Sequence, residues 1–151
     1  MSSSPYHSTD TWTESIEDYI KSIQEDSEIA SIKHHKMAIY AVNCRNLWSI
    51  PNILIPVILS PLTQTFKDDE FISYLSMCGF IVVGICASIL QYFNYGQRSQ
   101  ANFDTESKFD DLVTDIKEIL VKSNKCENSS TILRTIRMRY DTIRNQAPTG
   151  Y

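Results

Sequence analysis

Two long uncharged stretches dominate the hydrophobic pattern of the chain. Residues 47–66 (LWSIPNILIPVILSPLTQTF) and 71–93 (FISYLSMCGFIVVGICASILQYF) contain no Lys, Arg, Asp, Glu or His. A helix of roughly 20 apolar residues crosses the hydrocarbon core of a bilayer. Only residues 67–70 (KDDE) separate the two stretches, so the pattern predicts a transmembrane helical hairpin. Two buried helices of a soluble bundle are the alternative. Such helices need polar outward faces, which residues 80–90 hardly offer.

Amphipathic stretches flank the predicted hairpin. Apolar residues recur at three- and four-residue spacing from Ile16 to Ile32 and again from Phe103 to Leu120, which predicts helices. Gly96 is a candidate bend after the second span. The predicted protein is all-α. It begins with a flexible N-terminus (1–13) and an amphipathic cytoplasmic or interfacial helix (14–46), which precede the hairpin (47–93). A helix continues from the second span (94–123), and a C-terminal helix (129–146) follows a turn at 125–128.

Cations near the two spans predict their orientation. Basic residues flank the hairpin on its outer sides, whereas the loop between the spans contains one: Lys33, Lys36, Arg45, Arg98 and Lys108 against Lys67. Positive charge is retained on the cytoplasmic side of membranes. Both termini are therefore expected in the cytoplasm. Aromatic residues at headgroup depth are the expected interface anchors: Tyr40, Trp48, Tyr92 and Tyr95.

The first span contains three prolines, Pro51, Pro56 and Pro61. A proline inside a helix removes a backbone hydrogen bond, and a neighbouring helix can satisfy the freed groups. We therefore expect a kinked span. The kink is either a hinge or pore bend, or simply the shape of the helix.

Small residues in the second span indicate a packing face: Gly79, Gly84, Ala87 and Ser88. Gly84 and Ser88 lie four residues apart, a spacing that allows another helix backbone to approach closely. The partner helix is either the first span or a second copy of the chain.

The two ends carry opposite charge. The N-terminal helix is rich in Asp and Glu, while the C-terminal helix has a basic face: Arg134, Arg137, Arg139 and Arg144. Pairing of the two ends is one hypothesis, and contact of the basic face with anionic lipid or nucleic acid is another. The overall formal charge of −4 differs from the basic excess of nucleic-acid binders, so nucleic acid is not the expected partner.

Residue patterns that carry chemistry are absent from the sequence. The four cysteines, Cys44, Cys78, Cys86 and Cys126, form no CxxC motif, and the three histidines all precede the hairpin. Adjacent His34 and His35 are interpreted as solvated residues rather than metal ligands. Cys44 is either an inert thiol or a palmitoylation site beside the membrane. The four glycines form no phosphate-binding loop. We expect no enzyme activity, no metal and no cofactor.

The helix order resembles the SLATT family of two-span membrane proteins. The resemblance rests on a cytoplasmic helix, two closely spaced spans and a long helix that begins at Tyr92-Phe93 and runs through Phe103, Phe109 and Leu112, and it covers roughly residues 29–122. It implies an oligomeric membrane protein that acts as a pore-forming effector in prokaryotes. The chain departs from the family in having no His between residues 93 and 109. The pattern is also similar to small two-span proteins of large DNA viruses, which implies a virion inner membrane beneath a capsid.

Two functional hypotheses follow from these patterns. The first is a non-enzymatic membrane anchor or scaffold whose cytoplasmic helices bind copies of the chain or a protein layer, such as a capsid, above the bilayer. The second is an oligomeric pore like that implied by the SLATT resemblance.

Overall fold

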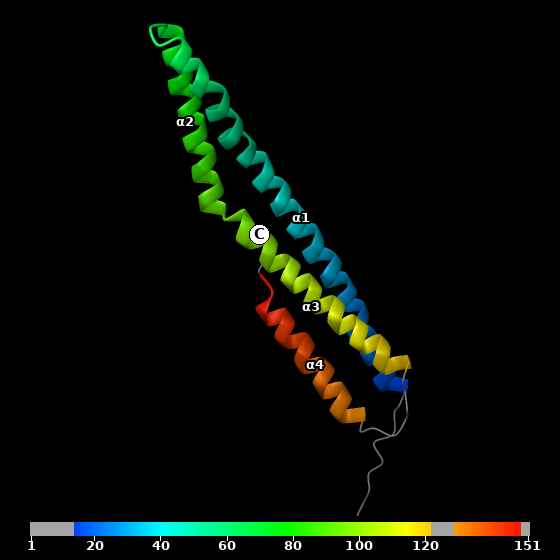
Figure 1. Ribbon diagram of the computed structural model, residues 1–151. Coiled ribbons are helices and arrows are strands. Elements are labelled where there is room, and N and C mark those ends of the chain that lie inside the picture. The colour runs from blue at the N-terminus through cyan, green and yellow to red at the C-terminus, as the bar shows by residue number, and fades with distance from the viewer. Residues whose placement is uncertain (1–13, 122–128, 149–151) are drawn as a thin grey trace, which may run out of the picture. The chain divides into compact units, whose positions relative to one another are not determined.

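The chain folds into four α-helices over the residues that the computed structural model describes, 14–121 and 129–148 (Figure 1). The helices are α1 (Glu14–Thr65), α2 (Glu70–Phe93), α3 (Tyr95–Val121) and α4 (Ser129–Gln146). The described residues contain no strand, so the all-α prediction is confirmed for them. The N-terminal residues expected to be flexible and the turn expected at 125–128 lie outside the described part.

The helices form two compact units. The first, here the bundle unit, comprises residues 14–35 of α1, residues 102–121 of α3, and α4. The second, here the hairpin unit, comprises Lys36–Ala101 and therefore holds the rest of α1, all of α2 and the start of α3.

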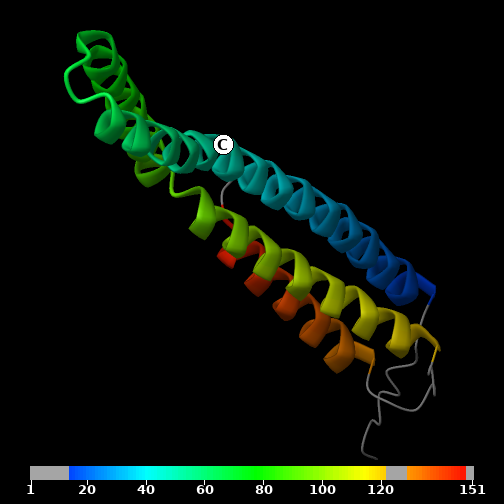
Figure 2. The same ribbon diagram turned by 45° about the horizontal axis from the view of Figure 1, so that its top comes forward.

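The bundle unit is an up-down-up arrangement of three helical segments. Residues 14–35 of α1 and α4 run in one direction and α3 runs in the other, side by side in both views (Figures 1 and 2). Their apolar stripes meet in one core: Ile20, Ile23, Phe109, Leu112, Ile116, Ile136 and Ile143. Ile20, Leu112 and Ile116 are completely buried. Burying one such side chain stabilises a fold by about 1.5–3 kcal/mol, so this core accounts for the association of the three segments.

The hairpin unit pairs the later part of α1 with α2 through a tight loop. Asp69 caps α2, because its Oδ1 accepts hydrogen bonds from the backbone N–H groups of Phe71 at 2.9 Å and Ile72 at 3.4 Å. Glu70 in the first turn adds a favourable charge at the helix N-terminus. The helix therefore begins at Glu70, within the loop expected at 67–70.

Helix α1 continues without interruption through Pro51, Pro56 and Pro61. One helix therefore covers both the predicted interfacial helix, 14–46, and the predicted first span as far as Thr65. Proline has no backbone N–H, so each proline leaves the carbonyl four residues earlier without its usual donor.

The junction between α2 and α3 lies at Asn94. This residue adopts a left-handed conformation (φ 46°, ψ 47°) that Asn tolerates better than most residues. Its N–H donates to the Leu90 carbonyl and its own carbonyl accepts from the Arg98 N–H, both at 3.1 Å. Gly96, the expected bend, lies inside α3 and has no positive φ. The bend prediction was therefore wrong by two residues.

Candidate functional site

The surface of the hairpin unit is largely apolar. Large hydrophobic side chains are exposed along both of its helices, among them Leu47, Ile50, Ile53, Leu54, Val57 and Ile58 of α1 and Phe71, Leu75, Met77, Phe80, Ile81, Val82 and Ile85 of α2. Soluble monomers rarely expose a continuous apolar surface of this kind. The surface therefore needs an apolar environment or another protein against it.

Two helical segments are long and apolar enough to cross a membrane. They are Glu14–Thr65 and Glu70–Val121, and the most apolar 18-residue windows within them are only 6% and 11% buried. The core helix of a soluble protein has the same length and composition, but it is mostly buried. The low burial of the two windows distinguishes them from the core helix of a soluble protein.

Contact between α1 and α2 centres on Gly79. A Cβ atom added at Gly79 would overlap the Cδ1 of Leu59 and lie 3.1 Å from the Cγ2 of Ile55. Leu59 is itself buried. The absence of a side chain at residue 79 thus allows the two helices of the hairpin to approach closely.

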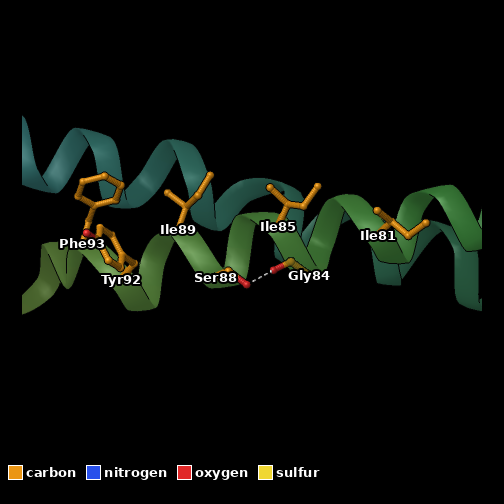
Figure 3. A pocket seen from close by; sticks show the side chains of 7 residues that line it. All are labelled: Ile81, Gly84, Ile85, Ser88, Ile89, Tyr92 and Phe93. Atoms are coloured by element: carbon orange, nitrogen blue, oxygen red, sulfur yellow. Dashed lines mark hydrogen bonds between the residues drawn. The ribbon is translucent and has the colours of Figure 1, made fainter.

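Gly84, Ala87 and Ser88 lie elsewhere on α2, on its exposed surface. A Cβ added at Gly84 would meet nothing within 4 Å, and the Ser88 hydroxyl donates to the Gly84 carbonyl at 2.8 Å. The neighbouring side chains form a groove of about 530 Å³ in which Ile81, Ile85 and Ile89 follow one another along the helix (Figure 3). Of the four predicted packing residues, Gly79 therefore lies against α1, whereas Gly84, Ala87 and Ser88 are exposed.

Asn52 introduces a polar group into the apolar part of α1. Among the described residues, its Oδ1 is the one buried side-chain oxygen or nitrogen without a hydrogen-bond partner. Pro56 stands four residues later and cannot donate to the Asn52 carbonyl. The side-chain oxygen of Asn52 and its backbone carbonyl are thus two polar groups within an apolar part of the helix.

The predicted interface aromatics differ in exposure. Tyr40 and Tyr92 are 70% and 82% exposed, whereas Trp48 and Tyr95 are half-buried. Tyr95 stacks on Phe93, with ring centroids 5.4 Å apart. Tyr40 and Tyr92 therefore present most of their surface outward, although the ring of Tyr92 also lies edge-on to Phe93 at 5.0 Å.

A polar layer joins α1 to α3 in the bundle unit. Ser31 Oγ donates to Asp110 Oδ1 at 2.6 Å, His34 Nδ1 lies 2.8 Å from Asn102 Oδ1, and His35 Nδ1 lies 2.8 Å from Glu106 Oε1. Because an amide oxygen only accepts, the Nδ1 of His34 must carry the proton that it donates. We call these six residues the polar layer.

The expectation of two solvated histidines was wrong for His34. Its side chain is buried, and its ring stacks on Phe109 with centroids 6.1 Å apart. His35 remains exposed and pairs with Glu106 when protonated. The sequence does contain a signal for this burial. Ser27, Ser31 and His34 continue the three- and four-residue spacing set by Ile20 and Ile23.

Ion pairs also link the helices of the bundle unit. Lys117 of α3 lies 2.9 Å from Glu28 of α1, and its hydrogen bond, together with one from Gln24, lowers the pKa of the Glu28 carboxyl. Arg139 of α4 pairs with Asp115 of α3. The hypothesis was that the basic C-terminal helix pairs with the acidic N-terminal helix. The structure instead pairs Arg139 of this helix with an acidic residue of α3.

The remaining arginines of the predicted basic face, Arg134, Arg137 and Arg144, are exposed. Arg137 lies 3.9 Å from Asp141 of the same helix.

The cysteines and the potential metal ligands of the described chain do not gather into one site. Among the cysteines of the described chain, Cys44 is half-buried, Cys78 exposed and Cys86 buried, all as free thiols, and Cys126 lies outside the described part. Within residues 14–121 and 129–148, no three His, Cys, Asp or Glu side chains are grouped closely enough to hold a metal ion.

Comparisons with protein-family models, curated proteins and solved structures give no match to this chain. The resemblance to the SLATT family and the viral interpretation therefore remain predictions, and function has to be argued from the two units themselves.

Proposed function

We propose that this chain is a non-enzymatic integral membrane protein in which the hairpin unit anchors the bundle unit to a bilayer as a scaffold for protein contacts. The observation that carries the proposal is the exposed apolar surface of the hairpin unit. Residues 47–66 and 71–93 also lack ionisable groups of the kind that ion-coupled transport uses. The arrangement supports anchoring rather than transport.

The bundle unit supports the scaffold part of the proposal. It has its own apolar core, and its charges lie at its surface. The distribution of Lys and Arg around the hairpin favours a cytoplasmic location for this unit. Such a unit offers exposed helix faces to partners on one side of the bilayer.

A pore is the second candidate, supported by the unpartnered side-chain oxygen of Asn52 and by the Asn52 carbonyl, to which Pro56 cannot donate a hydrogen bond. It predicts leakage of a small dye from vesicles that contain the protein at low density. The anchor predicts intact vesicles. Loss of leakage in the Asn52→Leu variant would assign the pore to this amide.

The anchor is tested by extraction of native membranes with alkaline carbonate. We expect the chain to stay in the membrane pellet, because only integral proteins resist this treatment. Release of the unmodified chain would overturn the proposal.

A pair of lysines placed in the hairpin gives a sharper test. Lys at the centre of a span costs about 2.5–3.5 kcal/mol of insertion free energy. The double variant Val57→Lys, Ile81→Lys changes two exposed apolar positions and should lower the membrane-bound fraction strongly. The matched control Ser22→Lys changes an exposed position of the bundle unit and should leave that fraction unchanged.

A further inference from the structure

The bundle unit carries two exposed faces of opposite charge. On α4, Arg134, Arg137 and Arg144 are exposed, and Met138, one turn after Arg134, is 55% exposed. On α1, Asp18, Glu25 and Asp26 are among the exposed acidic residues, and Tyr19 and Ile29 are exposed beside them. We call these the basic face and the acidic face.

Neither face is neutralised by the other within the chain. The ion pairs between helices of the bundle unit involve different residues, Arg139 with Asp115 and Lys117 with Glu28. Within the described residues, Arg134 and Arg144 have no acidic group within 4.0 Å, and Glu25 and Asp26 have no basic one. Both faces are therefore available to a partner.

The two faces also match in length and position. The basic face covers about 15 Å of helix and the acidic face about 12 Å, at a rise of 1.5 Å per residue. Helices α1 and α4 run in the same direction from the same end of the bundle unit (Figures 1 and 2). Both faces begin within about two turns of that end, so they lie at similar heights along the unit.

We propose that the basic face of one copy binds the acidic face of a second copy, so that α4 of each chain packs beside α1 of its neighbour. This rests on the proposed function, because copies held in one bilayer stand in the same orientation and bring both faces to one height. The contact joins two different surfaces, so it is head-to-tail and extends into a ring or a row.

A second copy explains the faces better than an anionic lipid surface does. Asp141 lies among the arginines, and α1 and α3 of the same unit are rich in Asp and Glu, which a negatively charged bilayer repels. The exposed apolar residues on both faces gain burial from contact with a helix. The complementary surface is present on the chain itself.

A charge-swap experiment tests the contact. Variant A carries Arg134→Glu, Arg137→Glu and Arg144→Glu, and variant B carries Asp18→Arg, Glu25→Arg and Asp26→Arg. Each full-length chain, labelled for energy transfer between copies, is placed in vesicles of uncharged phosphatidylcholine. We expect association to fall about tenfold or more for A alone and for B alone, since each variant opposes like charges across the contact.

The mixture of A and B decides the proposal, because every contact between A and B again joins opposite charges. We expect the mixture to recover association, and added salt to weaken it. A control with Thr131→Glu, Thr135→Glu and Thr142→Glu places new charges on α4 outside the basic face and should keep most of the association. No recovery of association in the mixture would overturn the contact.

Resistance to alkaline carbonate is measured on the same samples. Chains that resist extraction but do not associate contradict this inference and leave the anchor intact. Chains that are extracted contradict the anchor instead.

Discussion

The two units of this chain follow opposite rules for apolar side chains. In the bundle unit, Ile20, Leu112 and Ile116 are completely buried, and charged residues lie outside. In the hairpin unit, residues such as Leu54 and Ile85 are more than half exposed, and the contact between helices involves a glycine. One unit buries its hydrophobic surface, and the other presents it.

This difference indicates what holds each unit together. Water drives apolar groups into a core, so the bundle unit is stabilised by side-chain burial. In lipid that force between helices is absent, and close backbone packing replaces it. The close packing of Leu59 against Gly79 then holds the hairpin helices together, as the isoleucine and leucine core holds the helices of the bundle unit together.

The largest expected effect comes from matched leucine truncations in the two units. Leu112→Ala removes a completely buried side chain and should destabilise the bundle unit by about 2–5 kcal/mol. Leu54→Ala removes a side chain that is 51% exposed and should change stability by less than about 0.5 kcal/mol. Hydrogen exchange of α3 and α2 amides in detergent micelles measures both, and equal losses would contradict the comparison.

Two glycines give the next largest effect. Gly79→Leu forces a side chain against Leu59 and Ile55 and should cost about 1–3 kcal/mol through overpacking. Gly84→Leu enters open space, and replacing a glycine inside a helix is itself favourable by up to about 1 kcal/mol. Unfolding by SDS titration, followed by circular dichroism at low protein density, should separate the two variants. A larger loss of stability for Gly84→Leu than for Gly79→Leu would indicate that the helices pack through the Gly84 side of α2 and not through the Gly79 side.

The polar layer is expected to give a smaller difference in stability between variant and control. Asn102→Ala leaves the buried Nδ1–H of His34 without its acceptor, and an unsatisfied buried group costs about 1–3 kcal/mol. The control Asn145→Ala changes an exposed amide of α4 and should be neutral. Thermal unfolding in micelles measures both variants. No difference between them would mean that the His34 contact adds nothing to the bundle.

The smallest expected effect depends on pH. Hydrogen bonds from Lys117 and Gln24 lower the pKa of Glu28 in the folded chain, so the unfolded chain binds the proton more readily in acid. The added stability is therefore present above the usual carboxyl pKa and is lost as the pH falls through the lowered value. Glu28→Gln should reduce this acid dependence of the unfolding temperature slightly. Glu25→Gln, at an exposed carboxyl, serves as the control, and an identical change in both would contradict the Glu28–Lys117 pairing.

Much of the helical order is predictable because it depends on local pattern. The predicted second span at 71–93 and C-terminal helix at 129–146 lie within one residue of α2 and α4, since charge and periodicity change sharply at their ends. The membrane position of the hairpin is still a prediction.

Other features depend on tertiary contacts that a sequence pattern does not specify. Small residues at 79, 84, 87 and 88 indicate close packing, but only the approach of Leu59 distinguishes Gly79 from Gly84. Asn94 rather than Gly96 takes the left-handed conformation, because Asn tolerates it and the surrounding helices define where the chain turns.

His34 illustrates a further limit. The spacing that His34 shares with Ile20 and Ile23 indicates a buried position, but the residues that cover it, Asn102 and Phe109, belong to another helix and are identified only by the structure.

The polar layer also restricts how α1 and α3 can align. Sliding one helix past the other by a single turn would still place apolar residues opposite apolar residues over much of the core. It would, however, separate His34 from Asn102 and Ser31 from Asp110. A displaced alignment therefore leaves buried donors and acceptors without hydrogen-bond partners. The free-energy cost of these unsatisfied groups favours one register over others that bury a similar amount of apolar surface.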